Sequence, residues 1–399
     1  MRKIFKIALT ELCTLFYSPI AWLVLIIFTV QACMTYFRLV DIMLMQQFNK
    51  PLWYSIAKEM YTGNMGLFPN MLVHLYLYIP LLTMGLMSRE YSSGSIKLLY
   101  SSPVSSIQII FGKFLSMMIY SLILVGILFL FVGFTAWNVP SFDMSLALSG
   151  LLGIYLVICS YAAIGLFMSC LTSYQVVAAV ATLGALAFLN YVGRMGQEVP
   201  FIRDITYWLA LDRRAGTFIN GMICSEDFLY FVIMTAMFLG FAILKLQFIR
   251  ERRSMLSKVG RFLGVFIVAM LLGYVTSRPM LRLYHDSTHT KTNTLTEASQ
   301  EIVSKLDGGL KMTTYVNLFG SIYNITPAKV MADIARYNSY IRFKPETKMD
   351  YVFYYYTDTT DGFFAHRFAG KTLSEAAKEM AKFQGVNAKK YVPLSKVDP

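Results

Sequence analysis

Few residues in this sequence of 399 have the types and spacing needed for chemistry. His285 and His289 stand four residues apart, a spacing that could place both imidazoles on one helix face as metal ligands. They lie in a threonine-rich stretch with no nearby cysteine and no acidic residue beyond Asp286, so a solvated linker is the simpler interpretation. The five cysteines have no spacing typical of a disulfide framework or a metal site. We therefore predict no metal site.

Nucleotide hydrolysis would require a phosphate-binding loop. The Gly-Lys pairs of the chain, Gly112-Lys113 and Gly370-Lys371, lack the preceding glycine of a Walker A motif, although Thr372 follows the second pair. The long apolar stretches contain no aspartate or glutamate of the kind that transporters driven by ion gradients use. We therefore expect a chain that is not an enzyme and that needs no cofactor of its own.

The composition indicates that most of the chain lies in a membrane. Hydrophobic residues make up 56% of it and charged residues only 15%, whereas soluble proteins are about 25% charged. The stretches without any charged residue are 12–37, 61–88, 114–142, 144–193, 228–244 and 262–277. One crossing needs about 20 apolar residues, and the fourth stretch is long enough for two. The sequence thus predicts an α-helical polytopic membrane protein with about seven transmembrane helices.

The net charge of +13 comes from basic residues beside these stretches, which argues against nucleic-acid binding. They form three groups, namely Arg2, Lys3 and Lys6; Arg89, Lys97 and Lys113; and Lys245, Arg250, Arg252, Arg253, Lys258 and Arg261. The positive-inside rule places all three groups in the cytoplasm. We therefore expect a multi-pass protein of the cytoplasmic (inner) membrane, in contact with lipid, with a cytoplasmic N-terminus and with residues 278–399 outside.

The ends of the membrane region have their own patterns. Residues 1–18 carry apolar side chains at helical spacing opposite basic ones, which predicts an amphipathic helix in the inner interface. A plain extension of the first transmembrane helix is the alternative. Residues 19–250 hold six predicted crossings, and residues 251–277 hold a basic cytoplasmic loop and the seventh.

Residues 278–399 have a different composition, in which helical and strand patterns alternate. The predicted helices are 299–306, 327–341 and 373–383, and the predicted strands are 311–317 and 349–356. The alternation favours an α/β layer with a mostly parallel sheet. Because two strands are too few for an independent sheet, we expect an incomplete domain that either continues beyond residue 399 or is completed by a partner, and we favour truncation.

The most informative segment is PLLTMGLMSREYSSGSIKLLYSSPVSSIQIIFGK, residues 80–113, between the second and third predicted crossings. It contains a charged pair, a glycine, a short apolar face of Ile96, Leu98 and Leu99, and a proline before Gly112-Lys113 opens the next crossing. A short amphipathic helix held between two membrane helices would pass on a movement if a partner docked on it. An ordinary connecting loop is the alternative that the pattern leaves open.

This segment resembles the permeases of ABC-2 type exporters, specifically their gliding-motility GldF-like branch. The matching residues are Pro80, Thr83, Met84, Arg89, Glu90, Gly94, Leu98, Leu99, Ser102, Pro103, Gly112 and Lys113. The stretch YWLALDRRAGTFINGMI resembles the outer re-entrant region of the same family, so the resemblance covers about residues 1–250.

The resemblance implies that the segment is a coupling helix seated on a separate cytoplasmic ABC ATPase subunit, which would use ATP and magnesium. The implied ATPase-coupling residues are Arg89, Glu90, Gly94, Ser95, Leu98, Leu99 and Pro103. In this interpretation Arg89 and Glu90 make charged contacts with the ATPase, and Leu98 and Leu99 supply the apolar anchor. A second permease copy, identical or related, would complete the translocation path.

The remainder of the chain resembles a GldG-like accessory subunit, which implies a permease fused to the start of an exported accessory domain. The implied function is that of the transmembrane permease of an ATP-driven exporter. The alternative is a non-transporting scaffold that anchors an envelope or motility assembly, and such a scaffold would need no ATPase-docking element.

Overall fold

The computed structural model describes residues 2–46, 56–63, 65–140, 142–195, 199–251, 254–278, 281–305, 308, 310–320, 325–327, 329–344, 346–358 and 366–397. Arg252, Arg253, Pro279 and Leu306, which figure in the predictions above, lie outside these residues. The chain forms two compact units, of which the first comprises Met1–Val192 and Leu209–Asn293 and the second comprises Gly193–Trp208 and Thr294–Pro399.

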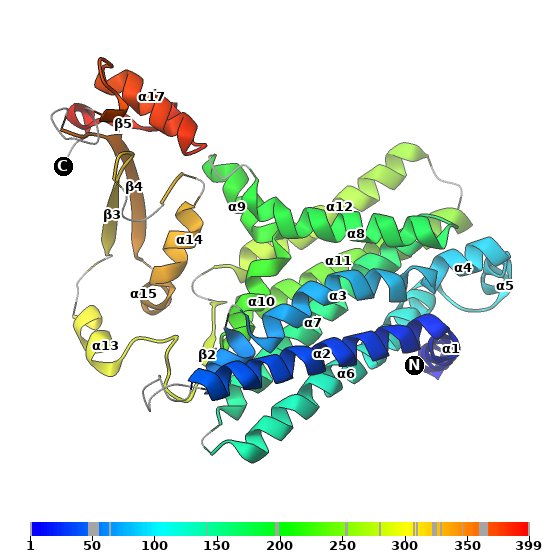
Figure 1. Cartoon of the computed structure of the whole chain (residues 1–399). Helices are drawn as coiled ribbons and strands as arrows, with labels where there is room; N and C mark the ends of the chain where they lie inside the picture. Colours follow the sequence, from blue (N-terminus) through cyan, green and yellow to red (C-terminus); the bar gives the residue numbers. More distant parts are fainter. Residues whose placement is uncertain are drawn as a thin grey trace. The chain divides into compact units, whose positions relative to one another are not determined.

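The first unit is built from helices. They are α1 (Arg2–Tyr17), α2 (Pro19–Gln46), the π-helix η1 (Lys58–Thr62), α3 (Leu67–Thr83), α4 (Gly85–Ser93), α5 (Ile96–Ser101), α6 (Ser106–Asn138), α7 (Met144–Ser169), α8 (Gln175–Tyr191), α10 (Leu211–Ile219), α11 (Ser225–Arg250) and α12 (Met255–Thr276). The long helices lie side by side, with α4 and α5 at one end and α10 at the other (Figure 1). The prediction of a helix near residues 1–18 is confirmed by α1.

Six of the described helical segments are long and apolar enough to cross a membrane. They are Pro19–Met45, Lys58–Ser93, Ser106–Asn138, Met144–Ser169, Ser225–Arg250 and Met255–Thr276. The remaining predicted crossing, the second of the two expected in the stretch 144–193, corresponds to α8, an apolar helix of 17 residues. Such a helix is about 26 Å long, less than the roughly 30 Å of a bilayer core. The described helices therefore comprise six full-length candidates and one shorter apolar helix, where the sequence predicts about seven full-length crossings.

Helix α7 is the central helix of this unit, because α3, α6, α8, α10 and α11 all pack against it. Two of its glycines make these close contacts possible. A Cβ atom at Gly153 would lie 2.5 Å from Cβ of Phe218 in α10, and one at Gly165 would overlap the Thr83 side chain of α3. The small side chains of α7 therefore set how closely the helices at both ends can approach it.

A two-stranded antiparallel sheet closes the end of the unit that contains α10. Strand β1 (Met222–Cys224) pairs with β2 (Tyr284–Asp286), with Ile223 opposite His285. Residues 278–293, predicted to begin the C-terminal domain, therefore belong with the first unit. The predicted boundary at residue 278 is moved to 294 because the β1–β2 pairing ties this segment to the residues between α10 and α11.

The second unit contains α9 (Pro200–Leu209), α13 (Glu297–Ser304), β3 (Lys311–Asn317), α14 (Val330–Ile334), α15 (Asn338–Phe343), β4 (Lys348–Tyr355), α17 (Leu373–Phe383) and β5 (Val392–Pro393). Its described strands form a parallel sheet in the order β3-β4-β5. The prediction of parallel strands at 311–317 and 349–356 is confirmed to within one residue. Strand β5, two residues long, was not predicted.

Two of the predicted helices in this unit are confirmed, and one is interrupted. Helix α17 begins and ends as predicted, with a capping box between Thr372 and Glu375. Helix α13 lies two residues earlier than the predicted 299–306 and is capped by Thr296, whose hydroxyl accepts a hydrogen bond from the Ser299 amide. The predicted helix 327–341 is divided into α14 and α15 by a 3₁₀ turn at Ala335–Tyr337, which Asn338 and Ser339, residues of low helix propensity, follow directly at the start of α15.

Candidate functional site

The candidate site is the elbow formed by α4 and α5, and Ser169 at the end of α7 fixes where it starts. The Ser169 hydroxyl accepts hydrogen bonds from the amides of Met87 and Ser88, both at 3.0 Å, and donates one to the Met84 carbonyl at 2.9 Å. These contacts satisfy amide donors in the first turn of α4, which has no side-chain cap of its own. A residue of α7 therefore holds α4 in place.

Gly94 makes the turn from α4 into α5. Its φ of +75° lies in the left-handed region, which glycine adopts without strain, and α5 begins two residues later. The predicted apolar face of α5 is divided: Ile96 is buried, Leu99 is half-buried, and Leu98 is 74% exposed. Leu98 is therefore the apolar residue of α5 that is available to a partner.

Helix α6 begins earlier than predicted. After α5 ends, Pro103 lies in a short non-helical stretch, and a capping box between Ser105 and Gln108 starts α6 at Ser106. Gly112 and Lys113, predicted to open the crossing, lie instead in the second turn of α6. A Cβ atom at Gly112 would lie 2.7 Å from Cβ of Ile7, so this glycine allows α1 to cross α6 closely.

A buried ion cluster joins α1, α4 and α6 beneath the elbow. The Lys113 ammonium lies 2.6 Å from Oε1 of Glu11 and 2.6 Å from Oε1 of Glu90, and the Lys113 side chain is only 1% exposed. Nη2 of Arg89 lies 3.5 Å from Oε2 of Glu11. Removing one member would leave uncompensated charge in a dry site, so the cluster strongly favours this arrangement of the three helices.

Two basic side chains hold the α5 segment from outside the cluster. Lys3 of α1 donates to the Pro103 carbonyl at 2.7 Å. Arg250, the last residue of α11, donates to the carbonyls of Val104 at 3.2 Å and Leu99 at 3.4 Å, and its guanidinium lies 4.9 Å from the Tyr100 ring centroid. The segment is therefore attached mainly through its backbone, which leaves the outward side chains free of these tethers.

The predicted coupling residues thus divide into two groups. Leu98 faces outwards, and Arg89, with 42% of its side chain exposed, points towards Glu11. Glu90 faces the interior and binds Lys113. Gly94, Ser95, Leu99 and Pro103 shape or anchor the segment: the Ser95 hydroxyl lies 2.9 Å from that of Ser93, and the Leu99 and Pro103 carbonyls accept the bonds described above.

Sequence reasoning did not assign Glu11, Ser169 or Arg250 to this site. One signal was present in the sequence, because Glu11 is the only acidic residue in an N-terminal segment of otherwise basic and apolar character. Ser169 and Arg250 are distant in sequence from the segment that they hold, and nothing in the residue pattern links them to it.

The opposite end of the unit has an ion network of its own. Nη1 of Arg214 in α10 lies 2.8 Å from Oδ1 of Asp227 and 3.4 Å from Oε1 of Glu226. The Thr217 hydroxyl donates to Asp227 at 2.7 Å, and Nε of Arg282 lies 2.9 Å from Glu226. Burial lowers the pKa of the Arg214 guanidinium, but the two carboxylates outweigh this effect and raise that pKa above its usual value.

A turn over residues 286–293 covers this end. Asp286 accepts hydrogen bonds from the Thr288 amide and hydroxyl, at 3.0 and 2.7 Å, and from the Asn293 amide at 2.9 Å. Burial raises the pKa of the Asp286 carboxyl, but these hydrogen bonds outweigh it and hold that pKa below its usual value. Asn293 also donates to the Asn220 carbonyl at 2.8 Å, which ties the turn to the end of α10.

The two histidines of this region serve the fold. His285 lies in β2, and the His289 amide donates to Asp143 at 2.7 Å. Asp143 also caps α7 by accepting from the Leu146 amide. Within the described parts of the chain, no three His, Cys, Asp or Glu side chains lie close enough together to hold a metal ion.

Comparison with known proteins supports the resemblance of the N-terminal half. Residues 5–200 match a family model described as ABC-2 family transporter protein, a range that extends from α1 to the start of α9 and includes the elbow and its ion cluster. No curated protein and no solved structure matches the chain. Proteins of this family are the transmembrane component of their transporters and not the ATPase, and they generally work with an ABC ATPase. Residues 5–200 are therefore an ABC-2 family transporter permease domain within a multi-pass membrane protein.

Proposed function

We propose that this protein is the permease subunit of an ATP-driven ABC-2 type exporter of the gliding-motility GldF-like branch, and that a separate cytoplasmic ATPase docks on α4 and α5. The observation that carries the proposal is the elbow itself: an outward Leu98 and a half-exposed Arg89 on a segment anchored to a buried ion cluster. Arginine is one of the residue types enriched among the few side chains that dominate binding energy at interfaces, and the exposed Leu98 adds apolar surface to the same elbow.

The contacts beneath the elbow support its role in transmission. A displacement of α4 would move Glu90 and hence Lys113 of α6 and Glu11 of α1, because a buried cation cannot lose its carboxylate partners cheaply. The same displacement would reach α7 through the three hydrogen bonds of Ser169. ATP-driven closure of the ATPase would in this way tilt several transmembrane helices together and open a path between two permease copies.

The docking test is recovery of the ATPase from detergent extract with tagged permease variants. Leu98→Glu places a charge on the docking surface without disturbing the ion cluster and should lower recovery by about tenfold or more. Leu283→Glu is the matched control, since Leu283 is 75% exposed against 74% for Leu98 and directly precedes β2, away from the elbow. Equal recovery with both variants would contradict the proposal.

We further propose that the elbow end is cytoplasmic and that the α10 end and residues 294–399 are extracytoplasmic, in keeping with the basic flanks. Cysteine labelling in intact spheroplasts tests this in a variant without the native cysteines, because Cys13 is exposed. A cysteine at Thr290, which is exposed, should react with an impermeant maleimide, and one at Ser101 of α5 should react only after permeabilisation. Ser287 would be a poor probe because it is 7% exposed. The reverse labelling pattern would invert the proposed topology.

A further inference from the structure

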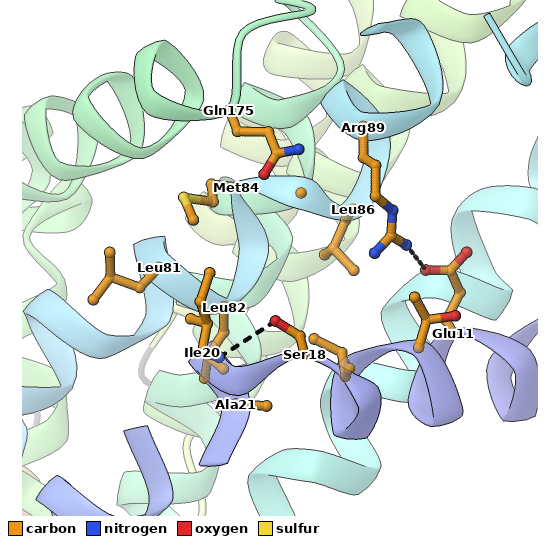
Figure 2. Close-up of a pocket in the computed structure, with 13 residues that line it drawn as sticks. Glu11, Ser18, Ile20, Ala21, Leu81, Leu82, Met84, Leu86, Arg89 and Gln175 are labelled. Atoms are coloured by element: carbon orange, nitrogen blue, oxygen red, sulfur yellow. Dashed lines mark hydrogen bonds and ion pairs between the residues drawn. The ribbon is translucent and has the colours of Figure 1, made fainter. Parts of the chain in front are cut away.

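A small cavity of about 60 Å³ lies next to the ion cluster, between the junction of α1 and α2, the junction of α3 and α4, and Gln175 of α8 (Figure 2). Its lining is divided by chemistry. Glu11, Ser18, Arg89 and Gln175 supply polar groups, and leucines of α3 and α4 supply the apolar wall. Figure 2 shows Arg89 extending from α4 towards Glu11 of α1 along one side of the cavity.

Aromatic and basic residues around the cavity place it at the level of lipid headgroups. Tyr17 and Trp22, on either side of the junction of α1 and α2, are 90% and 53% exposed. Tyrosine and tryptophan concentrate where the hydrocarbon meets the headgroups. Helix α1 also exposes three basic residues, Arg2, Lys3 and Lys6, as helices that lie on anionic membranes do.

The cavity wall offers partners for both parts of a phospholipid. The Arg89 side chain is 42% exposed, and its ion pair with Glu11 engages one nitrogen at 3.5 Å, whereas a guanidinium carries five donors. Ile20 and Leu81 line the cavity and are 36% and 40% exposed, so an acyl chain could lie along them. Arginine is the side chain best suited to a phosphate, which it binds through two parallel hydrogen bonds.

We propose that this cavity is a binding site for an anionic phospholipid, with its phosphate on Arg89 and an acyl chain along Ile20 and Leu81. An anionic headgroup is favoured over a zwitterionic one, because Arg89 lines the cavity and Glu11 is already bound to Lys113. Helix α1, which contributes to the lining, also exposes Arg2, Lys3 and Lys6 near its start. The lipid would compete with Glu11 for Arg89 and so act directly on the residues that join α1 to α4. Export would in this way respond to the composition of the inner leaflet, a regulation beyond the transport proposed above.

Tryptophan quenching by brominated lipids tests the site on the full chain without any ATPase, so the outcome is independent of the docking proposal. In a variant that keeps Trp22 and replaces Trp53, Trp137 and Trp208 by phenylalanine, brominated phosphatidylglycerol should bind near Trp22 about fivefold better than brominated phosphatidylcholine. Arg89→Gln should abolish this preference, and Arg89→Lys should keep most of it because the charge is retained.

Lys97→Gln is the matched control, since it removes one exposed cation of α5 that does not line the cavity. It should leave the lipid preference unchanged. Equal quenching by the two lipids in the parent variant, or an unchanged preference in Arg89→Gln, would overturn the proposal. Loss of the preference on adding inorganic phosphate would also overturn it, because a soluble phosphate and not a lipid would then occupy the site.

Discussion

Each end of the first unit contains a buried charge network, and the two networks are held together in different ways. At the elbow one lysine, Lys113, lies between two carboxylates that come from two other helices, Glu11 of α1 and Glu90 of α4. At the opposite end Arg214 also meets two carboxylates, but Asp227 and Glu226 are neighbours on α11 and have further partners in Thr217 and Arg282.

The two networks differ in how many interactions hold each charged group and in which segments cover the network. At the elbow a single ammonium joins three helices, and the adjoining α5 segment is held mainly through backbone carbonyls, with Leu98 outward. At the other end the β1–β2 pair and the turn at 286–293 cover the network. On the proposed docking at α4 and α5, we expect the elbow end to move as one body and the other end to stay closed.

The largest expected effect is at Lys113. Lys113→Met would leave Glu90 buried without its cation and Glu11 with only the Arg89 guanidinium at 3.5 Å, which should lower the free energy of unfolding by about 3–5 kcal/mol. The measurement is thermal unfolding followed by size-exclusion chromatography in detergent. Lys97→Met, which removes an exposed lysine of α5, is the control and should change little.

A triple variant at the same ion cluster separates the effect of unpaired charge from the effect of altered packing. Adding Glu11→Gln and Glu90→Gln to Lys113→Met removes the two carboxylate charges that Lys113 neutralised and should restore much of the lost stability. If Lys113→Met unfolds at the same temperature as Lys97→Met, the cluster does not hold the three helices together. The contrast drawn between the two ends would then be wrong.

The sequence predicted the parts of the elbow that depend on local pattern. Gly94, Pro103 and the short apolar face of α5 follow from residues that are neighbours in the chain, and the same is true of β3 and of α17 with its capping box. The contacts between distant residues could not be predicted, since Lys113 and Glu11 are 102 positions apart and Ser169 is 82 positions from Met87. Glu90 was therefore expected to face a partner and instead faces Lys113.

The other misplaced features have the same cause. The boundary expected at residue 278 moved because β2 pairs with β1, about 60 positions away in the chain, and a three-residue strand has no periodicity to detect. Hydropathy alone does not show that α8 ends after 17 residues, so the sequence could not distinguish this shorter helix from the six full-length candidates. The residue pattern predicts well which side chains are buried, but it predicts poorly which distant residues contact one another.

A smaller effect is expected at the closed end. Arg214→Met removes the central cation, but Thr217 still donates to Asp227 and Arg282 still pairs with Glu226. We therefore expect a loss of about 2–3 kcal/mol in the same melting assay. Arg278→Met, an exposed arginine stacked on Tyr274 at 4.1 Å, is the control. If Arg214→Met lowered the free energy of unfolding more than Lys113→Met does, Thr217 and Arg282 would not be compensating for the lost cation.

The smallest and most direct comparison uses two serines of α7, one at each end. Ser169→Ala would leave the amides of Met87 and Ser88 without their acceptor and should cost about 1–2 kcal/mol. Ser149 donates only to the Phe218 carbonyl, at 2.7 Å, so Ser149→Ala should cost about 1 kcal/mol or less. Hydrogen exchange separates them further: Ser169→Ala should speed exchange of the α4 amides, whereas Ser149→Ala should leave them protected. Faster exchange of α4 in both variants would mean that α7 transmits a disturbance along its whole length, and the two ends would no longer be independent.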